Sequence, residues 1–197
     1  MKNAQVTELL LQALETELGG VQVYKTALKC AQNEDLHEEL TKYLAQTTHH
    51  VEVVRGLFAD LGLDPDASSP GREVVRHIGS SLVAAMEMAL ASGPPEAAQL
   101  VAAECVTLAE TKDHMNWELI GEVAENLKGD SAKVMRTAYE EVEGDEDGHL
   151  YHSTGWGREL WIESLGTKAV LPPPEEQKHV QTAIGAARAK QARSELT

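Results

Sequence analysis

Apolar residues recur along most of this chain at alternating spacings of three and four, which is the pattern of helices with one buried face. We expect four long helices. The first runs from about Gln5 to Gln32 and the second from Glu34 to about Leu61. The third runs from Pro95 to about Leu127, and the fourth begins at Asp130 and ends before Gly166. The pattern therefore predicts an all-α fold.

The connections predict how these helices are arranged. Asn33 is a good cap for the second helix, and Lys128-Gly129-Asp130 is a short turn, so each pair of neighbouring helices should form an antiparallel hairpin. The stretch from Gly62 to Gly71 has the composition of a loop, and a shorter helix follows from Arg72 to about Ala91. This connection must carry the chain across the molecule. We expect a four-helix bundle of two hairpins joined by one long crossover that carries an extra helix.

The chain changes character after Gly166, so we expect a bundle domain at residues 1–166 and an appendage at residues 167–197. Pro172-Pro173-Pro174 is a stiff spacer and a natural helix start. A C-terminal helix is predicted from Glu175 to about Ser194. It has few large apolar residues, and we expect it to pack weakly on the bundle, embrace a partner subunit or fray.

Charged residues lie inside the apolar stripes of these helices. Glu17 lies in the middle of the inward face of the first helix, and Glu110 has the same place in the third. Glu146 and His149, three residues apart, share the inward face of the fourth helix, and His50 lies on that of the second. Buried carboxylates persist when they are paired, hydrogen-bonded or bound to a cation. Because carboxylate oxygens and imidazoles from four helices converge, the pattern predicts a metal site.

The second helix departs from the carboxylate-bridged di-iron arrangement, in which two helices each give a Glu and the other two each give Glu-x-x-His. Thr47 stands three residues before His50, and Gln46 stands three residues before His49. Neither register supplies the second bridging carboxylate.

His114, one turn after Glu110, lies on the inward face and is a candidate for the missing ligand. Three alternatives remain open: a two-metal site with altered ligands, a single metal, or a bundle with no metal. In the last case Glu17 with His50, and Glu110 with His149, would be ion pairs of the core.

Composition narrows the class of protein. The chain has 32 acidic and 17 basic residues and a net charge of −15, which argues against a nucleic-acid-binding surface. Cys30 and Cys105 lack metal-type spacing and are expected to be reduced thiols. The N-terminus lacks the apolar run of a signal peptide, and no apolar segment approaches membrane-spanning length. We expect a soluble, cytoplasmic protein without a membrane partner.

Short motifs in two segments carry a family resemblance. The segment from Leu14 to Phe58 contains Glu17, Asn33-Glu34 at the turn and Gln46-Thr47-Thr48-His49-His50; the segment from Ala102 to Leu150 contains Ala-Glu-x-Leu-Lys at 124–128 and an acidic run before Glu146. These motifs resemble the ferritin-like superfamily, and within it the Yci-type bacterial stress-response branch, which has Glu-Thr-x-x-Gln where this chain has residues 46–50. The seven-residue spacing from Glu17 to Tyr24 is similar to that of rubrerythrin. The resemblance covers residues 5 to about 165.

The resemblance implies a metal-binding bundle that forms a homodimer, with iron as the metal and manganese or zinc as alternatives. It does not imply one reaction, because ferritin-like proteins store iron, reduce peroxide, hydroxylate substrates or have no known activity. This chain has no Cys-x-x-Cys, so the rubredoxin-like module of rubrerythrin is absent. A peroxidase of that kind would need an external electron donor.

Two functions from different classes follow. In the first, iron held by the inward Glu and His residues reacts with dioxygen or peroxide in a stress response, as a ferroxidase or peroxidase would. In the second, the protein is a non-catalytic stress or interaction protein whose buried Glu and His are structural. The second helix discriminates between them, because loss of a bridging ligand at Gln46 or Thr47 would make reactive di-iron chemistry harder to sustain.

Overall fold

The computed structural model describes residues 4–177, and this part of the chain is helical with no β-strand. The helices are α1 (Ala4–Cys30), α2 (Glu34–Leu61), α3 (Pro70–Ser92), α4 (Pro95–Asn126), α5 (Asp130–Ser164) and the short α6 (Pro174–Gln177). The all-α prediction is confirmed, and so are the extra helix between the hairpins and the approximate helix ends. Most of the predicted C-terminal helix, residues 178–194, lies outside the described residues.

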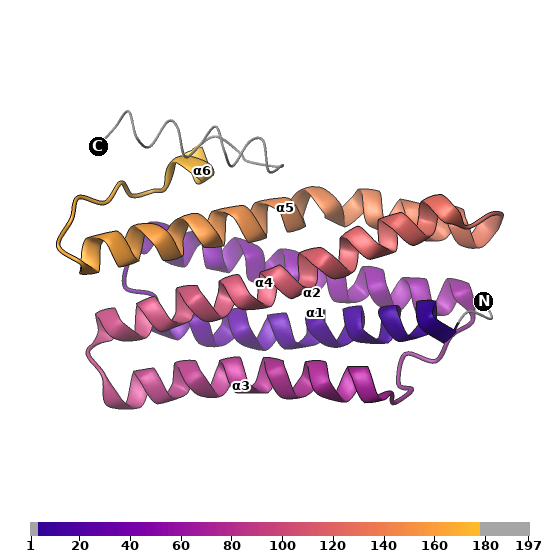
Figure 1. Cartoon of the computed structure of the whole chain (residues 1–197), viewed down its shortest axis with the longest axis horizontal. Helices are drawn as coiled ribbons and strands as arrows, with labels where there is room; N and C mark the ends of the chain where they lie inside the picture. The colour runs from indigo at the N-terminus through magenta and orange to yellow at the C-terminus, as the bar shows by residue number, and fades with distance from the viewer. Residues whose placement is uncertain (1–3, 178–197) are drawn as a thin grey trace.

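The four long helices α1, α2, α4 and α5 form one bundle. Figure 1 shows α1 and α2 as one antiparallel hairpin and α4 and α5 as another. α3, which connects the two hairpins in the sequence, returns the chain along the length of the bundle. α1 packs against both α2 and α4, and α5 packs against the same two helices, so each helix of the bundle has two antiparallel neighbours. α3 lies outside this set of four, against α1 and α4.

Local sequence explains where the helices begin and end. The side chain of Asn33 accepts a hydrogen bond from the backbone N–H of Leu36 at 3.0 Å, which caps α2. α2 ends at Gly62, whose φ of 65° is a left-handed conformation that glycine adopts without strain. Ser69 caps α3 in the same way as Asn33 caps α2, and Pro70 occupies its first turn. α3 therefore begins two residues earlier than the sequence predicts.

The bundle core consists of two apolar layers with a polar layer between them. On α1, the first apolar layer ends at Leu14 and the second begins at Val23, with Glu17 between them. The other three helices change over in the same way, at His50 on α2, at Glu110 on α4 and between Glu146 and His149 on α5. The apolar layers therefore exclude water from both ends of one shared polar layer.

α3 has an exposed apolar face. Val74, Ile78 and Met88 are 58%, 52% and 70% exposed. By length and composition alone α3 could span a membrane, so the prediction that no apolar segment approaches that length is wrong for this helix. A single such helix is weak evidence for a membrane protein, and α3 packs along α1 and α4.

A buried ion pair attaches α3 to α1. Glu15 accepts hydrogen bonds from Arg72 Nε at 2.8 Å and from Arg76 Nε at 2.7 Å. Burial opposes ionisation of Glu15, but the two guanidinium groups overcome this effect and lower its pKa. Arg72 also donates to the carbonyl oxygens of Pro65 and Ala67 and so holds the preceding loop.

Replacement of Arg72 should therefore destabilise the fold much more than replacement of Arg76. Arg72→Ala leaves the carbonyl oxygens of Pro65 and Ala67 without their donor and removes one of the two guanidinium groups that balance buried Glu15, so we expect it to lower the free energy of unfolding by about 3 kcal/mol. Arg76 donates to both oxygens of Glu15, but its side chain is 47% exposed and holds no loop carbonyl, so Arg76→Ala should cost less than Arg72→Ala. Urea denaturation followed by circular dichroism measures both. Equal losses for the two variants would contradict the role given to Arg72.

Candidate metal centre

Five of the six sequence-predicted ligands come together in the polar layer. Glu17, His50, Glu110, Glu146 and His149 are between 0% and 2% exposed. They come from all four helices of the bundle. Since each lies at the changeover between the apolar layers of its own helix, packing of those layers brings the five side chains to the same depth.

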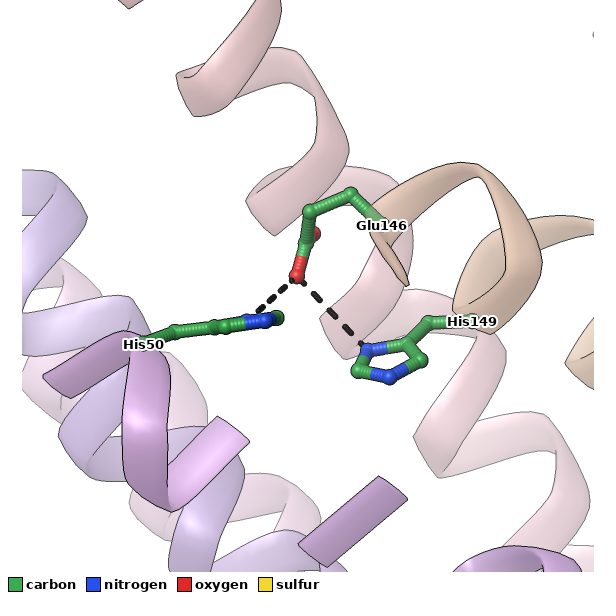
Figure 2. A group of neighbouring side chains, drawn as sticks. All are labelled: His50, Glu146 and His149. Atoms are coloured by element: carbon green, nitrogen blue, oxygen red, sulfur yellow. Dashed lines mark ion pairs between the residues drawn. The ribbon is translucent and has the colours of Figure 1, made fainter. Parts of the chain in front are cut away.

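The first group of ligand atoms consists of His50, Glu146 and His149. Figure 2 shows both imidazole rings directed at the Glu146 carboxylate, with its Oε1 atom 3.1 Å from His50 Nδ1 and 3.6 Å from His149 Nδ1. Glu110 Oε2 lies 3.4 Å from the same His149 nitrogen. The ligand atoms of His50, Glu146 and His149 are close enough together for one cation to contact all three.

The second group consists of Glu17, Asp113 and Glu146, so Glu146 belongs to both. Asp113 is 3% exposed and was not predicted as a ligand. Its signal is visible in the sequence as Glu110-x-x-Asp113, which has the same spacing as Glu146-x-x-His149. α4 thus supplies the additional carboxylate that α2 lacks.

α2 places Thr47, and no carboxylate, at the level of the polar layer next to α1. Thr47 is 1% exposed, and a Cβ atom added at Gly20 of α1 would lie 3.2 Å from its methyl group. The two helices therefore approach closely at this level, and the glycine at position 20 leaves room for the Thr47 methyl group.

Gln46 lies behind the imidazoles instead of among the ligand atoms. Its Oε1 is 3.1 Å from His149 Nε2, and its amide nitrogen donates to Asp145 Oδ1. The other carboxylate oxygen of Asp145 is 3.4 Å from His50 Nε2. Partners on the Nε2 side of both rings orient the Nδ1 atoms toward the centre, as outer partners of metal-bound histidines do.

The inward atoms of the layer have no hydrogen-bond partners. Natural proteins pair nearly all buried polar atoms, so a set of such atoms without hydrogen bonds in one place calls for an ordered water or a bound ion. Trp117 Nε1 donates to one oxygen of Glu17 at 2.7 Å and leaves the other unpaired. The ligand atoms without a hydrogen bond are Glu17 Oε2, His50 Nδ1, Glu110 Oε2, Asp113 Oδ1, both carboxylate oxygens of Glu146 and His149 Nδ1. Those of the two imidazoles and of Glu110, together with Glu146 Oε1, lie in the ion-pair contacts given above.

Electrostatics supports the same conclusion. Burial, together with the charges of Asp113 and Glu146, holds the pKa of Glu17 well above its ordinary value. Burial and the carboxylates of Glu146 and Glu110 do the same to the pKa of Asp113, and burial and Glu110 do so to the pKa of Glu146. These carboxylates ionise readily only when a cation offsets their repulsion, and divalent cations would do so.

His114, the sixth predicted ligand, lies apart from both groups. Its side chain is 14% exposed, and its Nε2 atom is 2.8 Å from Asp147 Oδ1. This hydrogen bond raises the pKa of His114. The structure therefore pairs His114 with Asp147 on the outer side of α4 and α5, while the neighbouring Asp113 points into the layer.

A third acid–imidazole group, also missed by sequence reasoning, joins α6 to the bundle. His152 Nδ1 lies 3.2 Å from Glu39 Oε1 and 2.5 Å from Glu176 Oε2. Burial opposes the charged imidazole, but the two carboxylates raise the pKa of His152 to about 9. Tyr43 and Trp156 donate to the two oxygens of Glu39. These contacts pair both oxygens of Glu39, and a protonated His152 balances the charge of the carboxylates, so we interpret the group as an ion-pair network.

The chain was compared with protein-family models, with curated proteins and with solved structures, and none of them matches. The function therefore has to be inferred from the residues of the site.

In the metal-free protein, Asp113→Asn should be stabilising at neutral pH. Because the folded-state pKa of Asp113 is raised, its carboxylate favours folding below the unfolded value of about 4 and opposes folding increasingly as the pH rises above it. We expect the variant to unfold with a free energy about 1–3 kcal/mol higher than wild type at pH 7. The difference should shrink as the pH is lowered toward 4.

Urea unfolding of chelator-treated protein at pH 5 and pH 7 measures this difference. Asp60→Asn, at an exposed position of α2, is the matched control and should change little at either pH. A metal-free Asp113→Asn protein that is less stable than wild type at pH 7 would show that Asp113 is a structural partner instead of a cation ligand.

Proposed function

We propose that this chain is a ferritin-like protein that binds two divalent metal ions in the polar layer of its bundle. The observation that supports the proposal most directly is that two ligand groups share Glu146 and that their inward atoms lack hydrogen bonds. A carboxylate that lies between two ligand sets, and whose oxygens accept no hydrogen bond, is placed to serve as a bridging ligand. The pairing of antiparallel hairpins and the crossover through α3 fit the ferritin-like arrangement but are general features of bundles.

The residues divide between two ions. His50, His149 and Glu110 would hold the first ion, Glu17 and Asp113 the second, and Glu146 would contact both. Four carboxylates supply four negative charges when ionised, and two divalent cations would balance them. The set departs from the usual di-iron plan in that α2 gives a single His and α4 gives Glu-x-x-Asp.

Iron is the metal we propose, because a mixed carboxylate and imidazole set suits ferrous iron, while manganese and zinc could also bind to it. Bound ferrous iron would supply electrons to dioxygen or peroxide. The residues of this chain would bind and orient the ions and exclude water with the two apolar layers. Reductive turnover would require an external electron donor, and the setting we propose is a stress response in the cytoplasm.

A second copy of the chain is the partner we propose. The exposed face of α3 is apolar, and from Ile78 to Met86 the helix carries no charged residue in a chain of net charge −15. Two such faces could approach without the repulsion that other acidic surfaces would cause.

The alternative is a non-catalytic protein whose buried Glu and His are structural. It is favoured by the ion pairs of His50 and His149 with Glu146 and Glu110, which need no metal if the imidazoles are protonated. It leaves the repulsion among four carboxylates only partly compensated.

Metal stoichiometry tests the proposal. Anaerobic loading of wild type with ferrous iron should give two ions per chain, and air should then produce near-ultraviolet absorption of oxidised iron. Asp113→Asn should retain about one ion, because His50, Glu146 and His149 remain. His149→Ala should also retain about one, and Glu146→Ala fewer than one, because it removes a ligand from both sites. Glu140→Gln, at an exposed position of α5, is the control and should bind two.

A wild type that binds no iron, manganese or zinc at stoichiometric level would refute the proposal and leave the structural alternative. If wild type binds one ion and Asp113→Asn still binds one, the centre holds a single metal, at His50, Glu146 and His149.

A further inference from the structure

A cavity of about 270 Å³ lies at α4 and α5 beside the metal centre. It is large enough for several water molecules. Its walls come from these two helices alone, within the described part of the chain. The lining residues are His114, Trp117, Glu118, Tyr139, Glu143, Glu146, Asp147 and Tyr151.

The inner wall of the cavity belongs to the metal centre. Trp117 and Glu146 are each 1% exposed, so they form its buried side. Trp117 donates its indole hydrogen to Glu17 of the second ligand group. Glu146 is shared by both groups, and neither of its carboxylate oxygens has a hydrogen-bond partner. A cation in this cavity would therefore be separated from the centre by Glu146 itself.

The outer side of the cavity is acidic. The Glu118 side chain is 64% exposed, and Glu143 is also exposed. Asp147 and His114 lie deeper, with side chains 13% and 14% exposed, and are bonded to each other. No lysine or arginine lines the cavity among the described residues. The cavity therefore offers carboxylate oxygens and one imidazole between the solvent and Glu146, and these are the ligand types that divalent cations prefer.

We propose that this cavity is the entrance through which divalent cations reach the centre. Glu118 and Glu143 attract the hydrated ion, Asp147 and His114 bind it in passing, and Glu146 transfers it inward by turning its carboxylate. This inference rests on the proposed two-metal function and assigns to His114 a role outside the centre. An acidic cavity with a low-dielectric wall raises the local concentration of cations and the rate at which they enter.

Cobalt(II) is the probe, because its visible absorption reports binding without redox chemistry. Full-length metal-free protein is mixed with cobalt in a stopped-flow instrument at low and high ionic strength. The test variant is the double replacement Glu118→Gln, Glu143→Gln, at two exposed positions that touch neither ligand group. The matched control is Glu125→Gln, Glu140→Gln, which removes two exposed charges from the same helices outside the cavity lining.

The test variant should bind cobalt about three- to tenfold more slowly than wild type at low ionic strength, and the control less than about twofold more slowly. High salt should reduce the difference, because it screens the exposed carboxylates. Both variants should reach the same final absorbance, with two ions per chain.

Equal association rates for test and control variants, with two ions still bound, would overturn the proposal that the cavity is the entrance. They would not contradict the two-metal centre. Failure of wild type to bind cobalt would overturn both. A test variant with unchanged rate but fewer bound ions would also overturn the entrance, since it would make these residues equilibrium ligands.

Discussion

Mutual repulsion among four buried carboxylates is the constraint on which the rest of the structure depends. Glu17, Glu110, Asp113 and Glu146 share one layer of the bundle, each no more than 3% exposed. Two imidazoles are their main counterparts among the described residues. A layer of this kind is costly unless cations enter it, because charges taken out of water need partners of opposite sign. Two apolar layers, one on each side, hold the carboxylates in place and close the layer toward both ends of the bundle.

Helix packing and ligand placement follow from one another. Each helix of the bundle has an apolar stripe that carries charged residues near its middle, and these residues meet when the apolar layers pack. α1 and α2 approach closely at Gly20 and Thr47, and α2 contributes His50 but no carboxylate at this level. The outer residues Gln46 and Asp145 then direct the imidazoles inward. The cavity beside Glu146, at α4 and α5, leaves room for a cation between the solvent and the polar layer.

The sequence predicts the helices and most of the centre because both depend on local periodicity. Glu17, His50, Glu110, Glu146 and His149 are found from their place in apolar stripes, and all five are buried together. His114 and Asp113 are adjacent, and a helical stripe cannot decide which of them turns inward; packing against α5 turns Asp113 inward and leaves His114 with Asp147. The network of Glu39, His152 and Glu176 joins segments far apart in the chain, so no local spacing indicates it.

Anomalous X-ray diffraction from crystals grown with manganese or cobalt would test the central claim most directly. Two strong peaks within about 3.5–4 Å of each other, on either side of the Glu146 carboxylate, are the predicted result. One of them should lie beside His50 and His149, and the other beside Glu17 and Asp113. An absence of peaks in the layer at saturating metal, with Glu146 bonded instead to protonated imidazoles, would contradict the account and make the polar layer a structural ion-pair network.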